Sequence, residues 1–86
     1  MRLEIDPQAL EDLRFWTKTD ARKSRKILEL IDAALRDPFR GLGKPEALKH
    51  DLAGCWSRRI DHEHRLVYRV ENDVLVVLSC RYHYRS

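Results

Sequence analysis

The order of its segments predicts an α+β protein built on one sheet. A short strand-like segment opens the chain, two segments with helical periodicity follow, and three strand-like segments fill the second half. The last three segments alternate in polarity and are joined by short connections, which is typical of an antiparallel meander. We therefore expect an antiparallel sheet with two N-terminal helices packed on one of its faces.

The first two elements are predicted from residues 1–20. MRLEI alternates apolar and charged side chains and indicates a short strand. Asp6 suits the N-cap of a helix and Pro7 suits its first position, so a helix is predicted over residues 7–18. Its apolar positions recur at helical spacing: Ala9, Leu10, Leu13 and Trp16.

A second helix is predicted over residues 21–36, with Asp20 as its cap. Its expected apolar stripe consists of Ser24, Ile27, Leu28, Ile31, Ala34 and Leu35. Its first turns carry four basic residues, Arg22, Lys23, Arg25 and Lys26. Such a cluster is either a solvated face or a surface that contacts phosphates, and its charge opposes the helix macrodipole.

A loop and three strands follow the second helix. Asp37 precedes a proline, which ends the helix. Residues 38–54 are rich in glycine and proline and lack the P-loop motif, while ALKHDL within them can pair briefly as a strand. Strands are predicted over residues 55–61, 64–71 and 74–83.

Strand alternation assigns a face to each side chain of these three strands. The even-numbered residues are largely apolar and should face the helices: Trp56, Arg58, Ile60, Leu66, Tyr68, Val70, Val74, Val76, Leu78, Cys80 and Tyr82. The odd-numbered residues collect the cations Arg59, Arg65, Arg69 and Arg81, together with His83. The strands keep this phase only if each connecting loop has an odd number of residues or a bulge makes up the difference, because a two-residue turn at Asn72-Asp73 would pair even positions with odd ones.

Size and charge bound the possible functions. The 86 residues indicate a single domain, 1–86, that buries only roughly 60 to 65 % of its unfolded surface, so any chemistry should occupy a shallow surface site. The net charge is +3, and the excess lies in residues 40–86, which hold nine basic and six acidic residues and all four histidines. This asymmetry weakly favours an anionic partner such as nucleic acid.

Several classes of protein and site are disfavoured. Cys55 and Cys80 lack metal-ligand spacing and are expected to be free thiols. No apolar run approaches a membrane span, and the N-terminus does not resemble a signal sequence, so we expect a cytoplasmic protein without membrane contact. His62 and His64 lack further ligands, so neither a metal site nor a cofactor is predicted.

The cationic sheet face allows two interpretations. Its arginines are either separate solvated residues or a phosphate site, because guanidinium groups donate paired hydrogen bonds to phosphate oxygens. His83 could hold or release a proton near neutral pH, although a lone exposed histidine is more often an ordinary surface residue. Glu46 lies in the loop, where it could reach over the sheet, with Lys49 three residues on. A base, an acid and positive charge together fit RNA cleavage through the ribose 2′-hydroxyl.

Several stretches of the chain closely resemble one known family. GKPEALKHDLAGCWSRRIDHEHRLVYRV and the later CRYHY are similar to the YoeB (Txe) toxins of the broader RelE group, as are FW, TD and DPFRGLGKPE. The resemblance implies a microbial-ribonuclease-like α+β fold. It also implies a ribosome-dependent endonuclease that cuts mRNA in the ribosomal A site and leaves a 2′,3′-cyclic phosphate and a 5′-hydroxyl.

The resemblance also implies roles for six residues. Glu46 of KPE is the expected general base, Arg65 of HRLVY the stabiliser of the charged phosphate, and His83 of RYHY the general acid. Lys49, Arg59 and Tyr84 match positions that support phosphate or substrate binding. Arg85 and Ser86 extend past the tyrosine that commonly closes such chains, with no assigned role.

The resemblance implies partners as well. An antitoxin of the YefM (Phd-like) type would fold as it wraps the toxin, and the complex would bind operator DNA and repress its own operon. The ribosome would supply ribosomal RNA and mRNA as further partners, and the free toxin could be a monomer or a homodimer. Two other readings stay open: a non-catalytic RNA- or ribosome-binding module that blocks translation by occupancy, and a structural subunit of a repressor complex.

Overall fold

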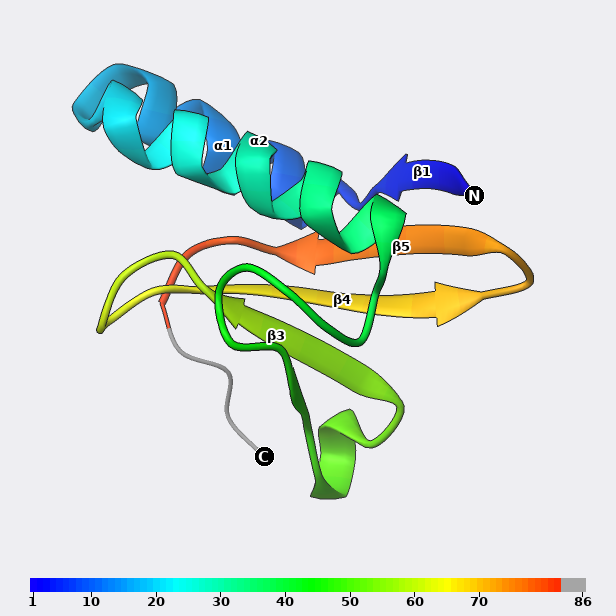
Figure 1. The fold of residues 1–86 in the computed structure, drawn as a ribbon. Coiled ribbons are helices and arrows are strands. Elements are labelled where there is room, and N and C mark those ends of the chain that lie inside the picture. The colour runs from blue at the N-terminus through cyan, green and yellow to red at the C-terminus, as the bar shows by residue number, and fades with distance from the viewer. Residues whose placement is uncertain (83–86) are drawn as a thin grey trace.

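Two helices cover one face of a five-stranded sheet (Figure 1) in the computed structural model, which describes residues 1–82. The order of the elements is β1 (Arg2–Ile5), α1 (Pro7–Thr19), α2 (Ala21–Arg36), β2 (Glu46–Ala47), a 3-10 turn (His50–Leu52), β3 (Cys55–Arg59), β4 (Arg65–Glu71) and β5 (Val74–Ser79). The predicted α+β class and both predicted helices are confirmed. Within residues 1–82, neither helix has the length and apolar character that crossing a membrane requires.

The ends of both helices follow from local sequence. The side chain of Asp6 accepts a hydrogen bond from the backbone N–H of Gln8 at 3.0 Å, and Pro7 occupies the first helical position. Asp20 serves both helices: its backbone N–H closes α1 on the carbonyl of Trp16, and its carboxylate accepts from the backbone N–H of Arg22 at 3.1 Å. These caps satisfy backbone groups that would otherwise lack partners.

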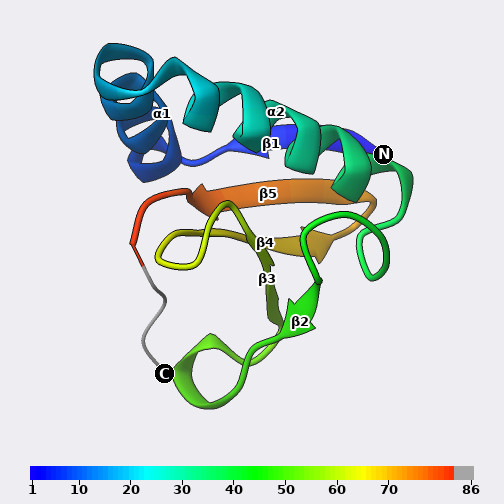
Figure 2. The same cartoon turned by 60° about the vertical axis from the view of Figure 1, so that its left-hand side comes forward.

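An antiparallel sheet was predicted, but the sheet is mixed. Its strand order is β1-β5-β4-β3-β2, and Figure 2 shows β2 beside β3, at the far edge from β1. β1 runs parallel to β5, whereas the other neighbouring pairs are antiparallel. The hairpins between β3, β4 and β5 force those strands to alternate in direction, but β1 is separated from β5 by both helices and most of the chain, so no hairpin constrains it.

The predicted faces are correct for β3 and β4 and wrong for most of β5. Asn72 and Asp73 form a two-residue turn with φ values of 50° and 62°, which pairs Glu71 with Val74. Leu75 and Val77 therefore face the helices, in place of the predicted Val74, Val76 and Leu78. A register shift between Val67 and Tyr68 then restores the predicted phase at Cys80, which packs against the helices. Tyr82, predicted on the same face, is instead 53 % exposed because β5 has ended by then.

Each face of the sheet carries a buried cluster. The larger one lies under the helices and includes Trp16, Ile27, Leu30, Ile31, Ala34, Leu66, Tyr68, Leu75 and Val77. A small cluster of Leu48, Cys55 and Val67 lies on the opposite side, which we call the outer face. The predicted α2 stripe is wrong at one position: Leu28 is 56 % exposed, and Leu30 is fully buried instead. Both cysteines are free thiols, as expected.

A buried arginine fastens the loop after α2 to the sheet. The Arg58 side chain is 0 % exposed and donates hydrogen bonds to the Tyr68 hydroxyl and to the carbonyl oxygens of Asp37, Arg40 and Leu42. Burial raises the pKa of Tyr68, although its hydrogen bond from Arg58 works in the opposite direction. These contacts hold the loop that leads into β2.

Gly43 permits the close approach of this loop to the core. Its φ is +86°, and a Cβ added there would lie 2.6 Å from Cδ2 of Leu30. Its carbonyl accepts a hydrogen bond of 2.7 Å from the backbone N–H of Arg59. The loop therefore delivers Glu46 to a fixed position at the edge of the sheet.

Candidate active site on the outer sheet face

Glu46 lies in an edge strand, not in the flexible loop that the sequence suggested. It pairs with Ser57 of β3, which pairs with Val67 of β4. Directly opposite residues of a ladder project to the same face. Because Val67 belongs to the outer cluster, the exposed Glu46 side chain lies on the outer face as well.

Arg59 and Arg65 form a cross-strand pair on the same face. They lie directly opposite each other at the ends of β3 and β4, two residues along from Ser57 and Val67. Arg59 is exposed, while the Nη1 atom of Arg65 donates to the carbonyl oxygens of Asp61 at 2.8 Å and His64 at 3.2 Å. Like charges directly opposite are unfavourable, so the pair favours an anionic ligand over a purely structural role.

Strand spacing sets the size of the site. Glu46 and Arg65 are two strands apart, about 10 Å across the sheet, and about 7 Å apart along it. Their long side chains can therefore approach one phosphodiester from two sides. Lys49 is exposed and follows the buried Leu48, at the start of the 3-10 turn.

Two of the predicted cations lie away from this site. Arg69 sits four residues along β4 from Arg65, and its Nε donates to Glu71 at 2.9 Å, which raises the pKa of the guanidinium. Arg81 follows the end of β5, with its guanidinium 3.5 Å from the ring centroid of Phe15 in α1. The cationic part of the outer face is thus smaller than predicted and centres on Arg59 and Arg65.

Strand β5 ends at Ser79 rather than continuing to residue 83, because side chains of α1 form hydrogen bonds with the backbone of the next residue, Cys80. The backbone N–H of Cys80 donates to the Asp12 carboxylate at 2.9 Å, and its carbonyl accepts from Nε1 of Trp16 at 2.8 Å. Both backbone groups of Cys80 thus bond to helix side chains instead of a neighbouring strand. Burial, with the nearby Asp12 charge, raises the pKa of the Cys80 thiol to about 12, so the thiol stays protonated.

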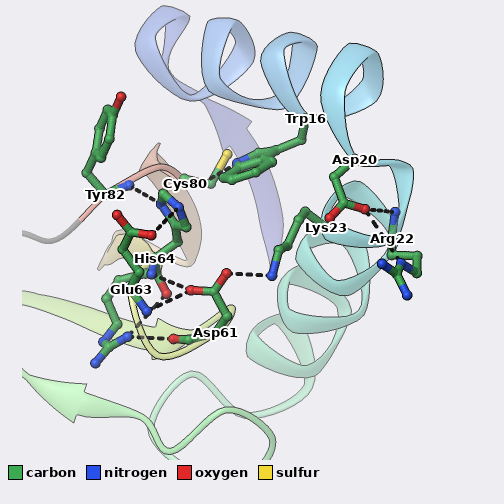
Figure 3. Close-up of polar contacts among 10 residues, drawn as sticks. Trp16, Asp20, Arg22, Lys23, Asp61, Glu63, His64, Cys80 and Tyr82 are labelled. Carbon is green, nitrogen blue, oxygen red and sulfur yellow. Dashed lines mark hydrogen bonds and ion pairs between the residues drawn. The ribbon is translucent and has the colours of Figure 1, made fainter.

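After Cys80 the chain turns towards Arg65. Tyr82 has a φ of 65°, and its backbone N–H donates to Nδ1 of His64 at 2.7 Å (Figure 3). Its carbonyl accepts a hydrogen bond of 3.1 Å from the backbone N–H of Arg65. Residue 82 is therefore fixed beside the start of β4. His83 and Tyr84 lie outside the described residues, so their assignment to the site stays a prediction.

The turn between β3 and β4 is organised by Asp61, a residue that was not among the predicted site residues. Its carboxylate accepts from the backbone N–H groups of Glu63 and His64 at 2.8 and 2.6 Å, and from Nζ of Lys23 at 2.5 Å (Figure 3). Burial alone would raise the pKa of Asp61, but these partners outweigh it and lower the pKa to about 2. The signal for this turn was an aspartate two residues before its N–H donor.

The same ion pair divides the basic cluster of α2. Lys23 points to Asp61, while Arg22, Arg25 and Lys26 line a shallow surface depression with Glu29. Arg22 and Arg25 are exposed and Lys26 is half-buried, so only part of the cluster presents charge to solvent. Across residues 1–82, no group of three or more histidine, cysteine or acidic side chains is arranged to hold a metal ion.

Comparison with known proteins decides the family. Residues 5–84 match the model of the "YoeB-like toxin of bacterial type II toxin-antitoxin system". The chain belongs to the YoeB toxin family. Toxin YoeB of Escherichia coli K12 is 52 % identical over 84 residues, which cover 98 % of this chain and 100 % of the relative. This YoeB-family chain is therefore the toxin of a type II toxin–antitoxin system.

Solved structures agree with the fold. The YoeB/ParE toxin from Agrobacterium tumefaciens superposes with a TM-score of 0.94 at 53 % identity, covering 98 % of this chain and 100 % of that one. A Staphylococcus aureus toxin, solved in a heterotetrameric YoeB-YefM toxin–antitoxin complex, superposes at 0.87 with 44 % identity and 98 % coverage of both chains. The YoeB dimer from the same species superposes at 0.88 with the same identity and coverage. The predicted RelE/YoeB-type fold is thus confirmed.

Proposed function

We propose that this YoeB-family toxin is a ribosome-dependent endoribonuclease that cuts mRNA in the ribosomal A site. The observation that carries the proposal is the shared outer face of Glu46, Arg59 and Arg65, which brings an acidic group and two arginines onto one side of the sheet. The fixed position of Tyr82 beside Arg65 supports a place for the following residue, His83, at the same site. The domain 1–86 would act as one catalytic unit without a metal.

The proposed chemistry is an in-line attack by the ribose 2′-hydroxyl. Glu46 takes the proton of that hydroxyl as its oxygen bonds to phosphorus. Arg65 stabilises the negative charge that builds on the phosphate oxygens, with Arg59 and Lys49 binding the flanking backbone. His83 gives a proton to the departing 5′-oxygen as the phosphorus–oxygen bond breaks. The products are a 2′,3′-cyclic phosphate and a 5′-hydroxyl, and Tyr84 would contact substrate.

The partners follow from this role. We propose the ribosome as the binding platform, with Arg22, Arg25 and Lys26 contacting ribosomal RNA phosphates. A YefM-like antitoxin would neutralise the toxin, as the name of the Staphylococcus aureus complex suggests for its own toxin. Operator DNA would be bound only through that complex. The free toxin would be able to form a homodimer, and its place of action would be the cytoplasm, away from membranes.

Primer extension on a defined mRNA separates nuclease activity from mere occupancy of the ribosome. With ribosomes present, the toxin should create new mRNA 5′ ends at the A-site codon, and without ribosomes it should create few. A translation block with no new ends would overturn the nuclease proposal and favour a non-catalytic binding module. Harmless expression without antitoxin, together with no new ends, would favour a structural subunit of a repressor complex.

A further inference from the structure

His64 is a buried histidine placed between the candidate site and the C-terminal segment. Its exposed fraction is 8 %. The imidazole packs edge-on against the Trp16 ring of α1, with centroids 4.7 Å apart, and lies 5.6 Å from the Tyr82 ring (Figure 3). A histidine this enclosed is poorly placed to touch an RNA substrate.

The hydrogen bonds of His64 connect Tyr82, near the end of the described chain, with Arg65 of the candidate site. Its Nδ1 accepts from the backbone N–H of Tyr82 at 2.7 Å, which requires an unprotonated Nδ1 and places the neutral ring's proton on Nε2. Its own carbonyl accepts from Nη1 of Arg65 at 3.2 Å. The backbone N–H of Arg65 in turn donates to the Tyr82 carbonyl. One residue thus holds both the Arg65 guanidinium and the chain just before residue 83.

We infer that His64 is a positioning residue. Its neutral imidazole holds the Tyr82 backbone against Arg65, a contact that we call the latch. The latch thereby fixes the point from which the segment beginning at residue 83 continues. The proposal rests on the proposed nuclease function only where cleavage is the readout. Backbone conformation adds to it, because a tyrosine at φ 65° needs such contacts to hold it.

The latch depends on an unprotonated Nδ1, because a proton there would present a second donor to the Tyr82 N–H. The charged groups around the ring are few. Glu63 on the same turn has a carboxylate oxygen 3.5 Å from Nε2, the nitrogen that carries the proton of the neutral ring. Asp20, between α1 and α2, lines the neighbouring depression together with Arg81 and Tyr82.

The other close contacts of His64 do not involve Nδ1. Asp61 binds the His64 backbone N–H, not the ring, and its charge is paired with Lys23. Trp16 contributes a neutral ring edge. The contact between Nδ1 and the Tyr82 N–H is therefore separate from the Asp61 anchor.

The test uses three variants of the full chain. His64→Asn keeps an acceptor at the position of Nδ1 but cannot take up a proton, whereas His64→Leu removes the acceptor. His62→Leu is the matched control, because His62 is an exposed histidine on the same turn. Amide hydrogen exchange at Tyr82, expressed as a protection factor, reports the latch directly. Nitrogen NMR of the imidazole reports its tautomer. Neither readout needs cleavage.

We expect an Nε2–H tautomer and a protected Tyr82 amide in the wild type at about pH 7.5. His64→Asn should keep the protection, and His64→Leu should lack it. With the nuclease active, His64→Leu should lower kcat about 10- to 100-fold with ribosome affinity unchanged, and His64→Asn should recover most of it. A proton on Nδ1 of the neutral ring, or equal Tyr82 protection in wild type and His64→Leu, would overturn the latch. If the wild type does not cleave mRNA but the exchange and NMR results are as expected, only the nuclease proposal is refuted.

Discussion

The Asp61 carboxylate lies 2.5 Å from Nζ of Lys23, and this contact ties α2 to the turn between β3 and β4. The same turn carries His64 and ends at Arg65, so a surface helix supports the candidate site from the side. The arrangement explains why one member of the basic cluster on α2 faces inward while its neighbours face solvent.

Asp61→Asn should reduce stability, because it removes a charged acceptor for Lys23 and two backbone N–H groups. We expect a loss of about 1–3 kcal/mol in the free energy of unfolding near pH 7, from urea denaturation. The folded-state pKa lies below the usual value of 3.8, so this contribution is complete above about pH 4 and fades as pH falls towards 2. The gap between wild type and variant should therefore close in acid.

Asp32→Asn is the matched control for that experiment. Asp32 pairs with Arg36 on the exposed face of α2, where an ion pair contributes little. A gap between wild type and Asp61→Asn that stays constant from pH 6 to pH 2 would contradict the role assigned to the Asp61 charge.

The neighbours Arg58 and Arg59 should have opposite mutant phenotypes. Arg58→Met leaves the Tyr68 hydroxyl and three loop carbonyls without their buried donor and should cost about 3–5 kcal/mol of stability. Arg59→Met removes an exposed cation and should leave the melting temperature nearly unchanged while weakening RNA binding. Thermal melts and binding titrations measure both effects, and equal destabilisation by the two changes would refute the assignment.

Glu46→Gln should fold normally and lose most cleavage. The side chain is exposed on an edge strand, so its contribution to stability is small, whereas loss of a general base costs about 10²- to 10⁴-fold in rate. Glu71→Gln is a suitable control, because Glu71 is an exposed acid on the same sheet, next to the hairpin turn. Single-turnover cleavage within about threefold of wild type would remove Glu46 from the mechanism.

Removal of residues 83–86 should abolish toxicity and keep the fold. The clusters formed by the described residues, and the Tyr82 contacts to His64 and Arg65, would remain in the truncated chain. Growth of cells that express the truncated chain, with circular dichroism of the purified protein, checks both parts. Full toxicity of a folded truncated chain would exclude His83 and Tyr84 from the site.

Local signals predicted the helices well, and long-range contacts explain the errors. The caps at Asp6 and Asp20 depend on residues within two positions and could be read directly. The end of β5 depends on a bond between Cys80 and Asp12, 68 residues apart in sequence, which no local pattern encodes. The faces assigned to β5 depended on whether Asn72 and Asp73 form a two-residue turn. The sequence showed that such a turn would exchange the two faces, but it did not show that the turn forms.

The candidate site, like the fold, was predicted in part from the sequence. Strand alternation and the position of Glu46 in the loop pointed to Glu46, Arg59 and Arg65, family resemblance gave them roles, and strand register brings them onto one face. The residues that hold them in place were not apparent, because Asp61, Lys23 and His64 act through backbone atoms and through a contact between a helix and a turn. Strand parity alone also grouped Arg69 and Arg81 with the site. Arg69 lies on the same face but four residues along β4 and pairs with Glu71, and Arg81 follows the end of β5 and packs on Phe15.

The central claim, attack by the 2′-hydroxyl in the ribosomal A site, is tested most directly by a single-atom change in the substrate. Ribosomes are programmed with mRNA that carries either a ribose or a 2′-deoxyribose at the scissile nucleotide, and cleavage is followed in a single turnover. We predict rapid cleavage of the ribose substrate with a 2′,3′-cyclic phosphate on the upstream product, and no cleavage of the deoxy substrate. Cleavage of both substrates at similar rates would contradict the mechanism.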